Sequence, residues 1–303
     1  MSTAVVAGLG VALAASLSLN TGFLLQHSGI ATAPALSLAR PRDAVRSFLR
    51  SRAWLAGLAF GVFGWGLHVV ALSLAPLSLV QAFVAGGLAL AVPVAAIGFH
   101  HRLEHAERVG VVALALALAL LPLGLGTIRS HSHFDHATLG IYLSIVCAGA
   151  LLLAWRRGGR RRPQVLGLAA GAFYGAADTA IKALTSLSAS GGVGHAALSP
   201  WLPIALVSTF GGFACFQRGL QTGRPLPVIA FMTAVTNLVS IPAGFVAFGD
   251  PLGLAPGWVA VHVLAFVVVI GAAYWLAPVQ ARIPEARSEP TPPANAVAGP
   301  RLR

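Results

Sequence analysis

Charged side chains are scarce in this chain of 303 residues. They make up 9% of the sequence, whereas a typical soluble domain contains about 25%. Hydrophobic residues make up 57%, so most of the chain has no polar surface to offer water or a nucleic acid. The shortage excludes a soluble enzyme, and it excludes nucleic-acid binding despite the formal net charge of +12. The class that remains is an α-helical protein that crosses the lipid bilayer several times.

Cysteine is nearly absent as well. Cys147 and Cys215 lie inside apolar runs and provide neither a disulfide framework nor a paired metal-binding motif. The apolar runs also lack the alternation of polar and apolar residues that is typical of β-strands. No nucleophile, His/Asp arrangement or glycine-rich phosphate loop stands out, so we expect neither an enzyme nor a cofactor. What remains are helices rich in Leu, Ala, Val and Gly that pack against lipid and against one another.

Nine apolar runs have about the 20 residues that an α-helix needs to cross a bilayer. They cover residues 4–27, 53–74, 77–99, 109–127, 138–155, 164–187, 201–217, 226–248 and 256–278. The sequence therefore predicts an all-α integral membrane fold with about nine transmembrane helices. Residues 279–303 are rich in Pro, Ala, Glu and Arg, and we expect them to form a disordered cytoplasmic tail.

The basic residues are distributed very unevenly between the two sides of the predicted bundle. The loops after the first, third, fifth and seventh runs, together with the tail, hold 18 of the 20 basic residues. The opposite loops hold Arg129, and Lys182 lies inside a run. Because cytoplasmic loops collect Lys and Arg, the sequence predicts a multi-pass protein of the cell membrane with its N-terminus outside and its C-terminus in the cytoplasm.

The chain contains a weak internal repeat. Rare residues recur at matching spacing: Trp54-Leu55 as Trp201-Leu202, Phe63-Gly64 as Phe210-Gly211, Pro76-Leu77 as Pro225-Leu226, and Pro93 as Pro242. The repeat relates the first four runs to the last four, and a shift by five spans inverts the second copy. We predict a five-plus-four inverted repeat with a first half at 1–163 and a second half at 164–278. Such repeats place a cavity between the halves near the middle of the membrane.

Three segments resemble the drug/metabolite transporter superfamily, with its EamA-like and NIPA-like branches. They are residues 71–81 (ALSLAPLSLVQ), 98–110 (GFHHRLEHAERVG) and 237–253 (NLVSIPAGFVAFGDPLG). The resemblance implies a secondary transporter that moves a small polar or amphipathic solute by alternating access, or Mg²⁺ in the NIPA-like branch. His101 and Asp250 stand where the superfamily motif usually has Glu, and nine spans with the N-terminus outside fit the NIPA-like branch better.

Asp178 and Lys182 are the two ionisable residues inside the apolar runs. Each such group costs about 2.5–3.5 kcal/mol to insert, which makes both of them candidates for function. Their spacing of four residues places them on one helix face, where they can neutralise each other, and Tyr174 extends the same face by one turn. We expect either a structural ion pair or a cavity site that binds substrate or relays a proton.

Other polar side chains inside the runs are candidates for cavity lining or for contacts between helices. Trp65 and Asn237 lie in the middle of the second and eighth runs, and Asn20 lies in the first. With Asp178, Lys182 and Tyr174 they complete the predicted substrate-binding set. Further polar residues noted in the runs are Thr21, His68, Gln81, Thr233, Thr236 and His262.

Two alternatives stay open. The loop His131-x-His133-x-Asp135-His136 has ligands that suit Zn²⁺ or Ni²⁺, but nothing fixes its geometry, so we expect an exposed loop and no resident metal. Transport of Mg²⁺ meets the objection that Asp178 is a lone carboxylate with Lys182 one turn away. A scaffold or lipid-binding protein that transports nothing is the rival class. The apolar fourth run predicts a wall that faces lipid or a second subunit of a homo-oligomer.

Overall fold

The computed structural model describes residues 3–30, 49–98, 105–123, 134–155, 162–222, 225–251 and 255–285. Within these ranges all regular structure is helical, in nine helices. They are α1 (Thr3–Ile30), α3 (Arg52–Leu74), α4 (Leu77–Gly98), α5 (His105–Leu120), α6 (His136–Trp155), α7 (Arg162–Ala197), α8 (Trp201–Thr222), α9 (Pro225–Phe248) and α10 (Pro256–Glu285). Each predicted span coincides with one of them, so the prediction of an all-α membrane fold is confirmed.

α7 and α10 extend furthest past the ends of their predicted spans. α7 continues to Ala197, well past 187, and its last turn bends at Gly192, whose φ of 81° is in the left-handed region. α10 continues to Glu285, past the predicted end at 278. The remainder of the predicted tail lies outside the described residues.

Four described helical segments are long and apolar enough to cross a membrane by themselves: Thr3–Phe23, Arg52–Leu74, His136–Trp155 and Pro227–Phe248. α7 and α8 meet the criterion together, with a bend of 82° at the break between them. The described apolar parts of α4, α5 and α10 are shorter, at Leu77–Gly87, Arg108–Leu120 and Pro256–Ala272.

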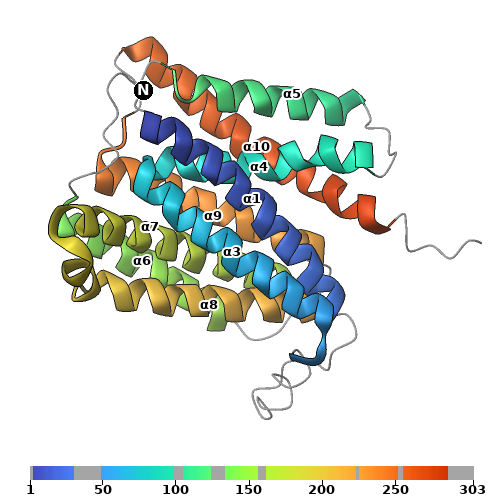
Figure 1. Ribbon diagram of the computed structural model, residues 1–303, viewed down its shortest axis with the longest axis horizontal. Coiled ribbons are helices and arrows are strands. Elements are labelled where there is room, and N and C mark those ends of the chain that lie inside the picture. The colour runs from blue at the N-terminus through green and yellow to red at the C-terminus, as the bar shows by residue number, and fades with distance from the viewer. Residues whose placement is uncertain are drawn as a thin grey trace, which may run out of the picture.

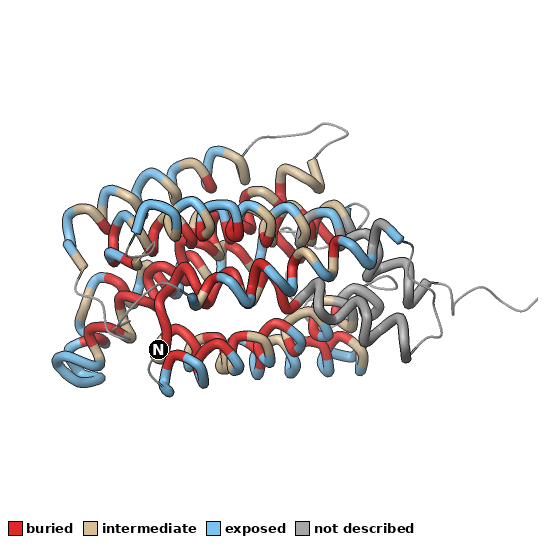
Figure 2. Tube along the Cα trace, turned by 90° about the horizontal axis from the view of Figure 1, so that it is seen from above, coloured by how far each residue is buried: buried red, intermediate tan, exposed pale blue. Residues whose placement is uncertain are grey.

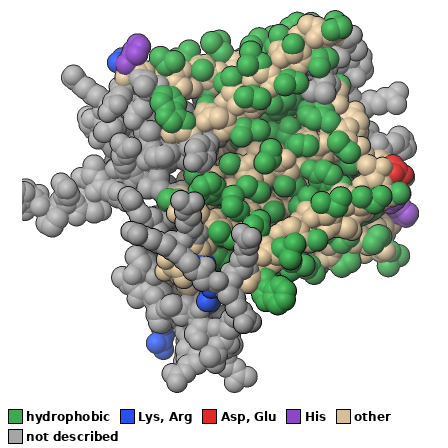
Figure 3. All heavy atoms as spheres, turned by 180° about the vertical axis from the view of Figure 1, so that it is seen from behind, with side chains coloured by type: hydrophobic (Ala, Val, Ile, Leu, Met, Phe, Trp, Pro, Cys, Tyr) green, Lys and Arg blue, Asp and Glu red, His purple; other side chains and the backbone are tan. Residues whose placement is uncertain are grey.

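The outer surface of the bundle is apolar. Figure 3 shows one face covered by hydrophobic side chains, with Lys, Arg, Asp, Glu and His side chains at its edges. α5 turns Val112, Leu116 and Leu120 outward at a spacing of four residues, as expected of a helix against lipid. Exposed apolar surface of this extent is rare on soluble proteins and is stable only where lipid covers it.

α7 is the central helix of the bundle. Most residues from Leu166 to Leu187 are buried, and Figure 2 shows the buried residues concentrated in the middle of the molecule. α7 packs against α3, α6, α8 and α9. A polar side chain on this part of α7 must therefore find its partners within the protein, on α7 or on the neighbouring helices.

Helices that correspond in the predicted repeat make corresponding contacts. α1 packs on α3 as α7 packs on α8, and α1 packs on α4 as α7 packs on α9. The predicted mates α4 and α9 contact each other directly. The N-terminus and the α7–α8 turn lie at the same end of the bundle, on the left of Figure 1. These contacts agree with the repeat, and the division into two inverted halves stays a prediction.

Glycines let α1 and α3 approach closely. A methyl group on Gly57 would lie 2.6 Å from the backbone nitrogen of Gln26 and 2.7 Å from the backbone oxygen of Gly22. Rigid backbone atoms cannot yield in the way that the end of a side chain can. Gly66, in the same helix, has open space around the equivalent position.

Gly57→Ala is therefore expected to destabilise the protein by about 1–3 kcal/mol, the usual cost of overpacking. Gly66→Ala is the matched control, and its melting temperature should be unchanged or slightly higher because alanine favours helices. Thermal unfolding of the two purified variants measures the difference. Equal melting temperatures for the two variants would contradict the close approach of α1 and α3.

Candidate functional site

Asp178 is the centre of a buried polar cluster formed by three helices. Its Oδ2 accepts a hydrogen bond from Nε2 of Gln81 at 2.8 Å, and its Oδ1 lies 3.1 Å from Nε2 of His68. Nε2 of Gln81 also lies 3.5 Å from Nε2 of His68. The Asp178 cluster thus joins α7 to α3 and α4, and all three residues are buried.

The imidazole of His68 has capacity for one more proton. Among the described residues its Nδ1 is buried and has no hydrogen-bond partner. When Nε2 donates to Asp178, a neutral ring leaves Nδ1 as an acceptor, and a protonated ring carries the charge that balances the carboxylate. The cluster can therefore hold either a proton on His68 or another cation beside Asp178.

Lys182 lies one turn beyond Asp178 and is fully buried. Its Nζ donates to the backbone oxygens of Leu72 and Ala75, at 2.8 Å each, and it is attracted by the carboxylate of Asp250. The structure thus corrects the predicted pairing of Lys182 with Asp178. Unpaired carbonyls at the C-terminal end of α3 carry partial negative charge, and together with Asp250 they attract the ammonium more strongly than one carboxylate on its own helix.

Asp250 is buried just after the end of α9. Its Oδ2 accepts a hydrogen bond from the backbone nitrogen of Ser78, in the first turn of α4, at 2.8 Å. Gly249 ends α9 with a φ of 63°, a conformation that favours glycine. At Gly244 a side chain would collide with the Asp250 carboxylate and with the backbone of Ser78. Lys182 and Asp250 thus bind both sides of the α3–α4 corner, defined as residues 72–78.

The other predicted site residues are not joined to this cluster by described hydrogen bonds. Tyr174 lies one turn before Asp178 and packs against Gly212 of α8. Trp65 is 44% exposed on the outer face of α3, so it faces lipid. Asn20 donates to the backbone and side-chain oxygens of Ser16, within α1.

Asn237 is buried on α9 and donates to the backbone oxygen of Thr233 at 2.8 Å. In the part of the chain that the structure describes, its Oδ1 is buried without a hydrogen-bond partner. It is therefore a second buried acceptor, apart from the Asp178 cluster.

A glutamine pair joins α1 to α8 at the other end of the bundle. Nε2 of Gln217 donates to Oε1 of Gln26, whose Nε2 donates to the backbone oxygen of Gly57 at 3.3 Å. Both side chains are buried, and Oε1 of Gln217 has no partner among the described side chains and backbone.

The described part of the loop at residues 131–136, which the sequence predicts to be exposed and without a metal, has a structural role. Asp135 caps α6, and the hydrogen bonds from the hydroxyl and the backbone nitrogen of Thr138 hold the pKa of its carboxyl below the usual value. His136 lies 3.3 Å from the indole nitrogen of Trp201. No group of three or more His, Cys, Asp or Glu able to hold a metal ion occurs in the described ranges; His131 and His133 lie outside them.

Sequence reasoning noticed His68 and Gln81 but did not place them in the site, and it missed Gln26 and Gln217. The available signal was the cost of polar groups in a membrane, which applies to amides and imidazoles as well as to charges. Asp250 appeared only as a departure from a motif, because it follows the apolar run instead of lying within it.

The helices, their apolar outer surface and the buried cluster define an all-α, multi-pass integral membrane protein. Over 274 residues the chain is 25% identical to the probable magnesium transporter NIPA9 of Arabidopsis thaliana, in an alignment that covers 85% of this chain and 78% of that protein. No protein-family model matches the chain. No solved structure matches it either. The name of this relative corresponds to the NIPA-like branch, one of the two that the sequence motifs resemble.

Proposed function

We propose that this protein is a secondary transporter that carries a small cation or cationic solute across the cell membrane by alternating access. The observation that carries the proposal is the Asp178 cluster, a buried carboxylate whose hydrogen-bond partners are an amide and an imidazole. The cluster joins α7 to α3 and α4, and so joins the proposed second half (164–278) to the proposed first half (1–163). A site between two halves is where alternating access requires it.

The charge of Asp178 favours a cationic solute. A buried carboxylate is costly unless a positive charge compensates it. The amide of Gln81 donates a hydrogen bond without charge, and Lys182 is directed at the α3–α4 corner. The charge of Asp178 is therefore compensated by a proton on His68 or by a bound cation. Exchange of the proton for the cation would couple the two during the transport cycle.

Mg²⁺ is the first cation to test. NIPA9, the protein to which this chain is similar, is described as a probable magnesium transporter. Mg²⁺ takes oxygen ligands and usually keeps several of its waters, so one carboxylate is enough to hold a hydrated ion. The objection from Lys182 is weakened, because its ammonium binds the carbonyls of Leu72 and Ala75.

The proposed topology keeps the N-terminus outside and the C-terminus in the cytoplasm. Under this topology the α3–α4 corner faces the outside and the glutamine pair faces the cytoplasm. We keep Tyr174 and Asn237 in the proposed substrate-binding set as lining residues. Trp65 is removed from the set because its side chain is exposed on the outer surface.

Purified full-length protein reconstituted into liposomes is expected to take up a cation in a saturable manner, above the rate of protein-free liposomes. The probes are Mg²⁺, followed with a trapped fluorescent indicator, and radiolabelled methylammonium and tetraethylammonium. An opposing pH gradient should accelerate uptake if His68 exchanges its proton for the solute. Failure to move any of the three cations would favour the scaffold alternative.

A further inference from the structure

Two further sets of polar contacts join the proposed halves, one on each side of the Asp178 cluster. Lys182 follows Asp178 by four residues, or about 6 Å at the helical rise of about 1.5 Å per residue. On the other side, Gly212 packs at Tyr174 and Gly219 packs near Leu166, which places Gln217 near the level of residue 169 on α7. The glutamine pair is then about 14 Å from Asp178 along the bundle.

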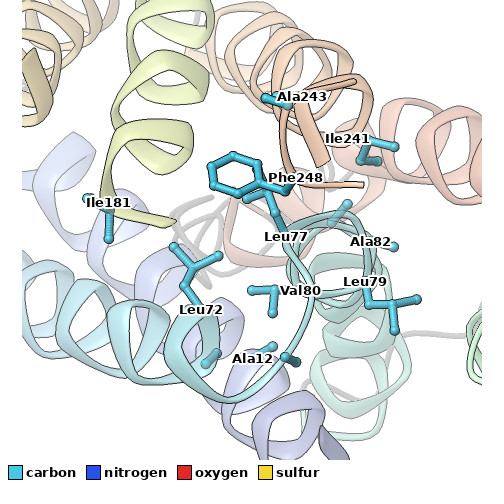
Figure 4. Close-up of a cluster of buried hydrophobic side chains, with 14 of the residues drawn as sticks. Ala12, Leu72, Leu77, Leu79, Val80, Ala82, Ile181, Ile241, Ala243 and Phe248 are labelled. Carbon is cyan, nitrogen blue, oxygen red and sulfur yellow. The ribbon is translucent and has the colours of Figure 1, made fainter. Parts of the chain in front are cut away.

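The contacts at the α3–α4 corner are charged. Lys182 binds the C-terminal carbonyls of α3, and Asp250 binds the N-terminal backbone of α4, so each charge lies at the helix end that favours it. Apolar side chains pack beside them. Figure 4 shows Leu72, Leu77 and Phe248 in the space between α3, α4, α7 and α9, with Ile181 on α7.

The contact at the opposite end is neutral. Gln217 donates one amide hydrogen bond to Gln26, and among the described residues its own Oε1 is buried without a partner. Charge-assisted hydrogen bonds are roughly twice as strong as neutral ones. These two described sets of contacts are therefore of unequal strength.

We propose that these contacts are the two gates of the transport cycle and that the weaker one opens first. The corner gate consists of Lys182 and Asp250 with residues 72–78, and the glutamine gate consists of Gln26 and Gln217. The inference rests on the proposed function, since a gate is needed only where a solute passes. With the proposed topology, the resting protein opens toward the cytoplasm, and release of the corner gate exposes Asp178 to the outside.

Cysteine accessibility tests the two gates. In full-length protein with Cys147→Ala and Cys215→Ala, one reporter is Ile181→Cys beside the corner gate and the other is Leu220→Cys beside the glutamine gate. Both positions are buried. The rate of reaction with a water-soluble maleimide, read by mass spectrometry, should be at least tenfold higher for Leu220→Cys because its gate is the weaker. A faster reaction at Ile181→Cys would overturn the order of strength.

Opening one gate should close the other. Asp250→Asn is expected to raise labelling of Ile181→Cys at least tenfold and to lower labelling of Leu220→Cys. Gln217→Leu removes the unpaired oxygen of Gln217 but leaves Oε1 of Gln26 without its donor, so the number of buried unpaired acceptors is unchanged and the variant should fold. It should have the reverse effect on the two reporters. Asp135→Asn makes the same change of charge at an exposed helix cap and should leave both rates unchanged. If either gate variant accelerates both reporters together, the protein has merely loosened and the gates are refuted.

Labelling requires no substrate, so the two proposals can fail separately. Reciprocal labelling without uptake of any cation would leave the gates standing and refute the transported class. Cation uptake with labelling rates that do not change reciprocally would leave the transport function standing and refute the gates.

Discussion

Lys182→Met is expected to lower the free energy of unfolding by about 3–5 kcal/mol, the usual effect of leaving a buried charge without its compensating partner. Methionine fills a similar volume but leaves Asp250 buried without its cation. It also takes a donor from the carbonyls of Leu72 and Ala75. Thermal or denaturant unfolding of the purified variant measures the loss.

The variant that restores stability identifies the partner of Lys182. Lys182→Met combined with Asp250→Asn removes both charges and should recover a large part of the loss, because an asparagine oxygen still accepts from Ser78. Lys182→Met combined with Asp178→Asn should recover nothing. Rescue by the Asp178 change would support the pairing that the sequence alone predicted and would contradict the structure at this corner.

The spans could be predicted from sequence because their signal is local. A run of about 20 apolar residues is enough to identify a helix in a membrane, and Pro256 or Gly249 marks an end without knowledge of the neighbours. The same local reasoning placed Asp178 and Lys182 on one face of α7. All of these inferences hold in the structure.

The partners of those two residues could not be predicted, because they come from distant parts of the chain. Asp178 and Gln81 are separated by 97 residues, and Lys182 and Ala75 by 107. Helical spacing says which side chains share a face but not which helix covers that face. Helical spacing therefore pairs Lys182 with Asp178, the nearest charge in sequence, while two carbonyls at the end of α3 and the carboxylate of Asp250 provide the stronger site.

The position of Trp65 could not be predicted either, because sequence alone does not show which face of α3 is buried. A tryptophan in the middle of a span is unusual, since this residue prefers the membrane interfaces, and the sequence therefore suggested a role in the cavity. In the structure the neighbouring His68 faces the bundle interior while Trp65 faces outward. Composition cannot distinguish the two faces of α3, because both are apolar.

Asp178→Asn is expected to abolish cation transport while leaving the fold largely intact. The asparagine oxygen can still accept the hydrogen bond from Gln81, and its volume is nearly that of aspartate, so the packing of α7 against α3 and α4 is preserved. What is lost is the negative charge that compensates a cation in a medium of low dielectric constant. Asp178→Glu retains that charge and should keep part of the activity.

The most direct test is the initial rate of cation uptake by liposomes that contain equal amounts of wild type, Asp178→Asn, Asp178→Glu and Asp135→Asn. The account predicts that Asp178→Asn falls at least 100-fold, to the rate of protein-free liposomes, while its melting temperature stays close to that of wild type. Asp178→Glu should be intermediate, and Asp135→Asn, which changes an exposed cap, should match wild type. A folded Asp178→Asn variant that transports the cation at the wild-type rate would show that the site lies elsewhere.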